Sequence, residues 1–286
     1  HSKFFPNFFN HFIINIWNAL NASARVGLFI VLFFSFCAIF APWLAPYGES
    51  ELVGDVWEPI GGTFILGTDQ IGRDILTRLI YGARNTMTLA MVSTTVSFTT
   101  GALFGFIAAT MGGAVDQVLS RIVDIIISIP TLIASLIVLS AVGTATPTLV
   151  LVIGIIYSMP VFRIARAVAM DIEVMDYVEA ARLRGEGMWW IMSKEILPNS
   201  MTPLAAEFGV RFCFVFLLIA SLSFLGLGLQ PPLADWGAMV RGNADGIAWG
   251  YYHPLMPAAC IAALTVGINF LVDRWVHKAS GLRDDQ

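Results

Sequence analysis

The chain contains five long stretches without Asp, Glu, Lys or Arg, at 26–48, 85–115, 125–162, 212–234 and 246–272. A membrane-spanning helix needs about 20 mostly apolar residues. The third stretch is long enough for two helices, and the turn-like residues 142–147 provide a short connection between them. We therefore predict an all-α membrane protein with six transmembrane helices, at about 26–46, 85–111, 118–141, 147–169, 202–228 and 254–273.

Composition supports this class. Hydrophobic residues make up 57% of the 286 residues and charged residues only 13%, whereas a soluble domain carries roughly 25% charged residues. The formal net charge of −4 argues against a nucleic-acid partner, which would require a basic patch. Cys37, Cys213 and Cys260 each lie in an apolar run without metal-site spacing, so we expect buried apolar side chains and no metal.

The distribution of Lys and Arg predicts the orientation. If both termini are cytoplasmic, four of the 16 basic residues fall outside (Arg73, Arg78, Arg84 and Arg241), Arg211 lies within a span, and the other 11 fall inside. This bias is the one expected of a cytoplasmic side. We therefore predict a cytoplasmic segment at 1–25, a transmembrane domain at 26–275 and a cytoplasmic tail at 276–286. A cleaved signal peptide is not expected, because the first apolar run is long and begins only at residue 26.

Two segments outside the spans stand out. The predicted external loop at 47–84 carries six acidic residues, and the predicted cytoplasmic loop at 170–200 is long enough for two short helices. In the stretch 171–185 the acidic residues come first and Arg182 and Arg184 come last, as the helix dipole favours. Gly185 then suits a left-handed helix stop. A second helix is expected at about 188–197, ended by Pro198.

The cytoplasmic loop allows two interpretations. Its apolar stripe could dock into a soluble partner, or the segment could lie on lipid headgroups with Trp189 and Trp190 as aromatic anchors. The run Glu179-Ala180-Ala181-x-x-x-Gly185, followed by Leu197-Pro198, resembles the EAA loop of permease subunits of binding-protein-dependent ABC importers. Glu195 departs from the apolar residue common in that family at large, although the peptide-importer branch often has a polar residue there.

Further motifs resemble the C-type permeases of the dipeptide, oligopeptide and nickel branch of that family. They are the first-loop stretches 66–74 and 79–84, the third-span pattern Arg121-x-x-Asp124 with Pro130, and the fifth-span stretches 220–232 and 235–237. They occur in the family's order over most of residues 26–275. The resemblance implies a type I ABC importer permease fold in a bacterial inner membrane.

The resemblance also implies partners and roles. A second homologous permease would share the pore, two cytoplasmic ATPases would bind the loop at Glu179, Ala180, Ala181 and Gly185, and an extracytoplasmic binding protein would deliver cargo. Di- or oligopeptides are the expected cargo, with nickel chelates, glutathione or opines as alternatives. The chain has no phosphate-binding loop, so we expect no cofactor or catalytic residue in it, and ATP and Mg in the ATPase partners.

In the external loop, Asp69, Arg73 and Asp74 are the candidate contacts to the binding protein or a cap on the outer pore. A plain solvated connector is the alternative, although loops of this length usually have a function.

The only charged pair well inside a predicted span is Glu207 and Arg211, four residues apart on span five. This spacing places both on one helix face in the favourable order for an ion pair. A charge in hydrocarbon costs at least about 2.5–3.5 kcal/mol, so the face should meet protein or water. Two roles remain open, a structural pair and a patch lining the translocation path that binds the charged ends of a peptide.

Two local contacts are also expected. Arg121 and Asp124, three residues apart, could pair near the inner end of span three. Gly101-x-x-x-Gly105 in span two predicts close packing against another helix. A membrane-embedded enzyme would need paired catalytic residues and an ion-coupled transporter would usually show inverted repeats. Neither feature is evident in the sequence.

Overall fold

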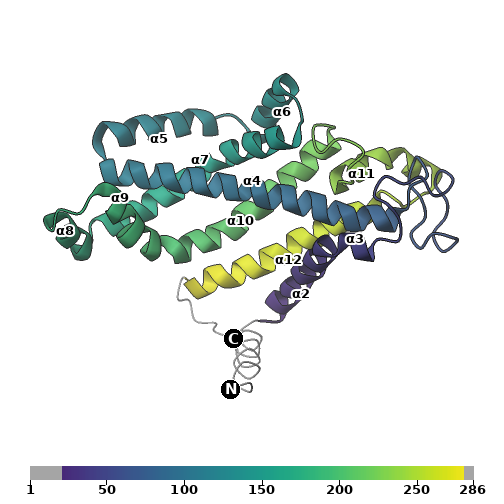
Figure 1. The fold of residues 1–286 in the computed structure, drawn as a ribbon, viewed down its shortest axis with the longest axis horizontal. Coiled ribbons are helices and arrows are strands. Elements are labelled where there is room, and N and C mark those ends of the chain that lie inside the picture. The colour runs from purple at the N-terminus through teal and green to yellow at the C-terminus, as the bar shows by residue number, and fades with distance from the viewer. Residues whose placement is uncertain (1–20, 280–286) are drawn as a thin grey trace, which may run out of the picture.

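The computed structural model describes residues 21–279, an elongated bundle whose long helices run roughly side by side (Figure 1). The described residues contain no β-strand. The helices, in order, are α2 (Ala22–Ile39), α3 (Ala41–Leu44), α4 (Ile75–Met111), α5 (Gly113–Ile127), α6 (Thr131–Val142), α7 (Thr146–Glu173), α8 (Asp176–Leu183), α9 (Met188–Ile191), the π-helix η1 (Met192–Ile196), α10 (Leu197–Phe224), α11 (Trp236–Gly242), the 3₁₀-helix η2 (Ala244–Trp249) and α12 (Leu255–Ala279).

Five helical stretches of the described chain are long and apolar enough to cross a membrane: α2, α4, α7, the run from α9 through α10, and α12. The sixth candidate is the pair α5 and α6, which is bent by 87°. The predicted single helix over 118–141 is therefore wrong. Pro130 lacks a backbone N–H and holds an extended ψ of 126° before α6, so the helix stops and restarts in a new direction.

The predicted boundaries also differ from the structure at other helices. α4 begins at Ile75, because Asp74 caps it by accepting a hydrogen bond from the Thr77 N–H at 2.7 Å. The predicted loop 47–84 therefore ends at 74, and the charges of Arg78 and Arg84 had hidden the first turns of the helix. Pro198 does not end the preceding helix, since η1 carries the helical path into α10.

The end of α10 lies at Phe224 rather than 228. Gly226 adopts a left-handed φ of 90°, and the Leu227 N–H returns to the Leu222 carbonyl at 2.8 Å. This is the glycine stop that closes many helices. The first predicted span, 26–46, is likewise α2 followed by the short α3.

Close packing of α4 on α7 depends on glycine, as predicted for Gly101 and Gly105. A Cβ on Gly101 would lie 2.6 Å from the Ser158 carbonyl oxygen, and one on Gly105 would lie 2.8 Å from the Phe162 carbonyl oxygen. Any side chain at either position would push the helices apart. The predicted small-residue contact is therefore confirmed, and it makes α4 and α7 the central pair of the bundle.

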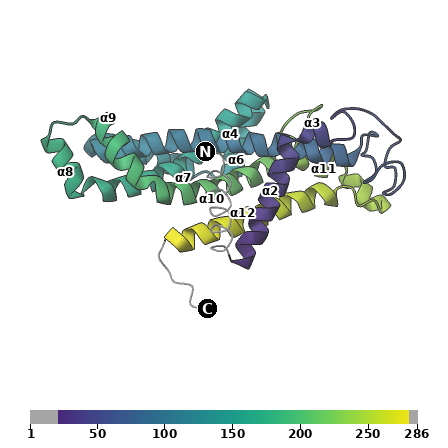
Figure 2. The same cartoon turned by 60° about the horizontal axis from the view of Figure 1, so that its bottom comes forward.

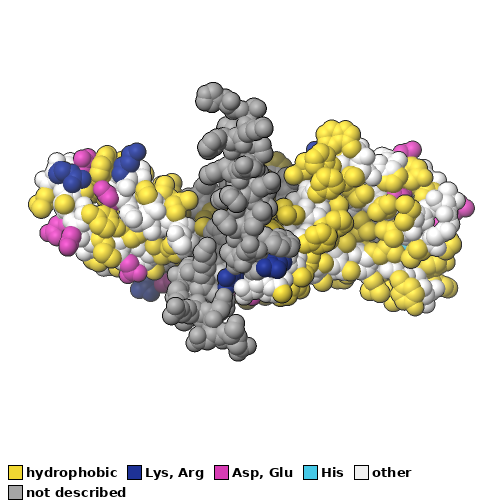
Figure 3. Space-filling view, turned by 90° about the horizontal axis from the view of Figure 1, so that it is seen from below, with side chains coloured by type: hydrophobic (Ala, Val, Ile, Leu, Met, Phe, Trp, Pro, Cys, Tyr) yellow, Lys and Arg dark blue, Asp and Glu magenta, His cyan; other side chains and the backbone are white. Residues whose placement is uncertain are grey.

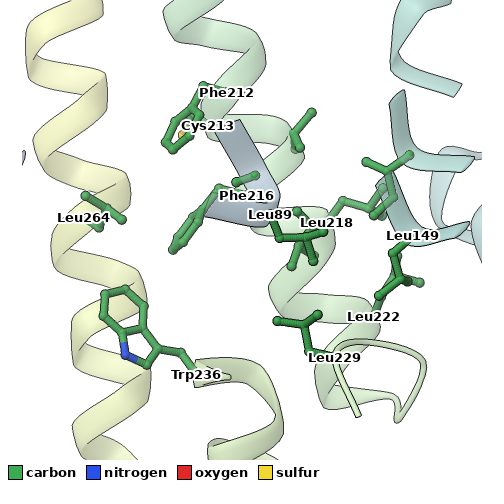
Figure 4. Close-up of a cluster of buried hydrophobic side chains, with 14 of the residues drawn as sticks. Leu89, Leu149, Phe212, Cys213, Phe216, Leu218, Leu222, Leu229, Trp236 and Leu264 are labelled. Atoms are coloured by element: carbon green, nitrogen blue, oxygen red, sulfur yellow. The ribbon is translucent and has the colours of Figure 1, made fainter. Parts of the chain in front are cut away.

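The largest hydrophobic cluster joins α4, α6, α7, α10, α11 and α12 (Figure 4). Trp236 is fully buried in it, with its ring 6.2 Å from that of Phe216 and its Nε1 donating to the Leu79 carbonyl at 2.9 Å. Large apolar side chains remain exposed along the outside, including Phe29, Leu32 and Ile137. Figure 3 shows hydrophobic side chains over much of the right-hand half of this face and a group of charged side chains at its left-hand end, and such apolar surface is expected of a bundle in a bilayer.

Candidate functional site

Residues 174–196, which we call the short-helix segment, lie at one end of the bundle (Figures 1 and 2). The predicted helix over 171–185 is interrupted, because α7 continues to Glu173 and α8 begins only at Asp176. The predicted stop at Gly185 is confirmed. Its φ is 87°, and the Glu186 N–H returns to the Ala181 carbonyl at 3.2 Å, which is a left-handed helix cap.

α8 is held to the bundle by one apolar side. Val178 and Ala181 are fully buried, and Val178 belongs to a cluster that we call the anchor cluster. Its members come from α4, α7, α8, α9, η1 and α10: Phe106, Ala165, Ala169, Ile172, Val178, Ile191, Met192, Ile196 and Leu204. An ion pair between Arg182 and Glu173 adds a second attachment to the end of α7. A displacement of α8 would therefore also displace residues packed on three long helices, α4, α7 and α10.

The opposite side of α8 is open. Glu179, Ala180 and Gly185 are exposed, and Leu183 is 83% exposed although it is apolar. Of the four residues predicted to couple to an ATPase, three therefore lie on an accessible surface and Ala181 forms part of the attachment. Trp189 is also exposed, whereas Trp190 is half-buried beneath the Arg184 guanidinium, 5.7 Å from its ring.

The predicted ion pair within α10 is present. Arg211 Nε donates to Glu207 Oε1 at 3.0 Å, and the two side chains are only 11% and 13% exposed. The guanidinium carbon lies 5.9 Å from the ring of Tyr157 on α7 and 5.8 Å from that of Phe214. The pair thus faces protein, as predicted from the free-energy cost of placing a charge in hydrocarbon. Aromatic rings lie beside the Arg211 guanidinium.

Asp69, Arg73 and Asp74 lie in a second region, the cap, which comprises residues 45–74 and 229–254 at the other end of the bundle (Figure 1). Asp69 is 1% exposed, and its carboxylate accepts hydrogen bonds from Arg73 Nε at 2.7 Å and from the N–H groups of Ile71 and Arg73 at 3.0 Å. The Asp74 carboxylate accepts a hydrogen bond from the Thr77 N–H at the start of α4. The proposed contact surface is corrected here, because these three side chains point inward and already have partners.

A buried polar network that the sequence did not reveal joins the cap to α4. Arg78 on α4 lies 3.6 Å from Asp69 Oδ2 and donates to the Glu49 carbonyl at 3.0 Å. Thr86 on α4 donates to Asp235 at 2.8 Å, and burial raises the pKa of that carboxyl. The residues are far apart in sequence, so no spacing pattern could have grouped them.

Two ion pairs join α5 to α7. Asp124 pairs with Arg163 at 2.5 Å, and Asp116 pairs with Arg166 through both of its oxygens. The predicted pairing of Arg121 with Asp124 is therefore wrong, because a guanidinium on the neighbouring helix is the partner that the fold supplies.

Comparison with known proteins agrees with this architecture. The family model "Binding-protein-dependent transport system inner membrane component" matches residues 101–278, and "N-terminal TM domain of oligopeptide transport permease C" matches residues 20–54. The di/tripeptide transport system permease protein DppC of Pseudomonas aeruginosa is 36% identical over 274 residues, covering 93% of this chain and 88% of the relative. The glutathione transport system permease protein GsiD of Pectobacterium atrosepticum is 30% identical, covering 92% and 86%.

A solved structure described as an amino acid ABC transporter with histidines shares the fold, with a TM-score of 0.53 and 20% identity over 71% of this chain and 94% of that chain. The main family model covers more than half of the chain, and the relatives align along nearly all of it. The chain therefore belongs to the inner-membrane permease family of binding-protein-dependent ABC importers, in its C-type branch and with the type I permease fold.

Proposed function

We propose that this permease imports di- or oligopeptides, that it forms the pore with a second homologous permease, and that two cytoplasmic ATPases drive it. The peptide relatives support the cargo class. The coupling of ATP hydrolysis to transport is assigned to the short-helix segment, because this segment is open on one side and packed against α4, α7 and α10 on the other. An extracytoplasmic binding protein delivers the peptide to the cap end.

The proposed orientation places both termini and the short-helix segment on the cytoplasmic side of the inner membrane. ATP and Mg are held by the ATPases, which bind around Glu179, Ala180 and Gly185. When the ATPases close, they displace α8, and the anchor cluster transmits that displacement to three long helices. A packed cluster moves as a unit, so the bundle has two discrete arrangements that expose the path to one side or the other.

The test is reconstitution of the chain with its partner permease, ATPases and binding protein in liposomes, followed by uptake of labelled Ala-Ala. We expect uptake that requires both ATP and the binding protein. Glutathione serves as a competitor, because one relative carries that name. Uptake without ATPases, or failure of the chain to assemble with them, would overturn the proposal.

We also propose that Glu207 and Arg211 form a structural pair that holds α10 against α7. The low exposure of both side chains and the aromatic rings beside Arg211 support this role over a direct contact with cargo. The double variant Glu207→Arg with Arg211→Glu should then keep most of the peptide uptake. If the swapped complex assembles and hydrolyses ATP but no longer transports, the pair contacts cargo instead.

A further inference from the structure

A second charged pair, between α5 and α7, differs in character from Glu207 and Arg211. Asp124 on α5 and Arg163 on α7 are 51% and 53% exposed in the isolated chain, against 13% and 11% for Glu207 and Arg211. Figure 1 shows α5 alongside α4 and α7 at an edge of the bundle. Arg163 directly follows the uncharged stretch that ends at residue 162. A charged pair in this position should face water or protein rather than lipid.

The pair also retains hydrogen-bonding capacity. Among the described residues, Asp124 uses one carboxylate oxygen and Arg163 uses one terminal nitrogen in their contact. A guanidinium has five N–H donors and a carboxylate about four acceptor sites, so each member can bind a further group. The neighbouring Asp116–Arg166 pair already ties α5 to α7 through two hydrogen bonds. A second ion pair is therefore not needed to join these two helices, and the unused donors and acceptors of Asp124 and Arg163 are available to another group.

The open pair borders a cavity of about 340 Å³ between α5 and α7, lined by Ser120, Val123, Asp124, Phe162, Arg163 and Arg166. This volume lies in the range of small-molecule sites, roughly 300–1,000 Å³. Its charged lining is Asp124, Arg163 and Arg166, and Arg166 is already paired with Asp116, which leaves one acid and one arginine open to a ligand. A lone anion would meet the acid and a lone cation the arginine, whereas a zwitterion can satisfy both signs at once.

We propose that this cavity is a binding site for the charged ends of a small peptide on the translocation path. Asp124 accepts the peptide ammonium, Arg163 donates to its carboxylate, and Val123 and Phe162 provide apolar contact for its side chains. The inference rests on the proposed peptide importer and adds the place where the permease itself contacts the main chain of its cargo. It requires no specificity for side chains, which suits a site that different peptides must pass.

The first experiment uses the complete importer in liposomes with labelled Ala-Ala. Asp124→Asn and Arg163→Gln should each lower the peptide transported per ATP on the order of tenfold, the effect expected when a charge-assisted hydrogen bond is lost. The ATPase activity stimulated by the loaded binding protein should not change. Arg121→Gln is the matched control, because it removes the same charge from an exposed position on α5 outside the cavity, and it should transport normally.

A merely structural role is tested by the swap Asp124→Arg with Arg163→Asp. If the pair only joins two helices, the swap restores transport. If it binds peptide ends, the reversed polarity leaves transport low while the complex still assembles. Wild-type transport in the two single variants, or rescue by the swap, would overturn the inference.

A binding experiment separates this inference from the proposed function. In the assembled complex, with the three native cysteines replaced, Ser120→Cys places a thiol in the cavity wall. Ala-Ala should slow its alkylation, and the uncharged analogue N-acetylalanine amide should not. This result holds or fails whether or not the importer transports Ala-Ala. Protection by phosphatidylethanolamine alone would identify a lipid headgroup site, and equal alkylation with and without Ala-Ala would show no site; either outcome overturns the inference.

Discussion

The cap and the short-helix segment differ in how they hold their charged residues, although both expose large apolar side chains. In the cap, Asp69, Arg73 and Asp235 are buried and paired, and Trp236 lies in the core. In the short-helix segment, the apolar Leu183 is exposed. The cap holds these charged residues through contacts within the chain, whereas the exposed side of α8 leaves Glu179 and Leu183 open to solvent.

This difference has a physical basis. Buried charges are tolerated only where every partner is in place, so a region built on them is rigid and fails when one member is removed. An exposed apolar surface is hydrated in the free chain and contributes free energy when a partner covers it. Changes in the cap should therefore affect folding, and changes in the short-helix segment should affect assembly.

The largest expected effect is in the cap. Asp69→Ala leaves the guanidinium of Arg73 buried without its carboxylate and removes the charge that faces Arg78, and breaking a buried pair costs about 3–5 kcal/mol. Thermal unfolding of the detergent-solubilised chain should show a clear loss of stability. Asp55→Ala in the same segment is the control, because Asp55 is exposed, and it should stay within about 0.5 kcal/mol of the wild type. Equal stability of the two variants would contradict the rigid cap.

An intermediate effect is expected at the end of α8. Gly185→Ala forces a side chain into a left-handed conformation, at a cost of about 1–2 kcal/mol. Because no other group lies near this position, the strain should alter only the turn after α8. We expect weaker co-purification of the ATPases with an unchanged unfolding temperature of the bundle.

The matched control for that change is Gly187→Ala. Gly187 is also open to solvent, but its φ of −78° suits any residue. It should bind the ATPases normally. If both variants lose the ATPases equally, the surface itself rather than the left-handed turn is responsible.

The smallest effect concerns His253, which is buried in the cap next to the stacked rings of Tyr251 and Trp57. Burial lowers the pKa of His253 from 6.5, opposed by the Glu58 backbone and the charge of Asp69. A lowered histidine pKa means that protonation favours the unfolded state, so stability should decline as pH falls below 6.5 towards the folded pKa. Unfolding measured at pH 7.5 and at pH 5.5 checks this, and His253→Phe should reduce the difference. A cap that grows more stable in acid would contradict it.

Several features of this protein followed from the sequence alone. The apolar runs placed the long helices, Gly185 ended α8, and Glu207 paired with Arg211. All three are local, because helix geometry depends on the spacing of residues within a few turns of one another. The motifs indicated the permease family for a different reason, because several of them occur along the chain in the same order as in that family.

Other features were decided only by the tertiary structure. Asp124 found its partner on α7 rather than three residues away, Asp69 turned inward, and the charged first turns of α4 became helical. In each case the local sequence was compatible with more than one arrangement. The arrangement that forms depends on which distant segment packs beside the residue. A charged side chain can be buried only where tertiary packing places a partner next to it.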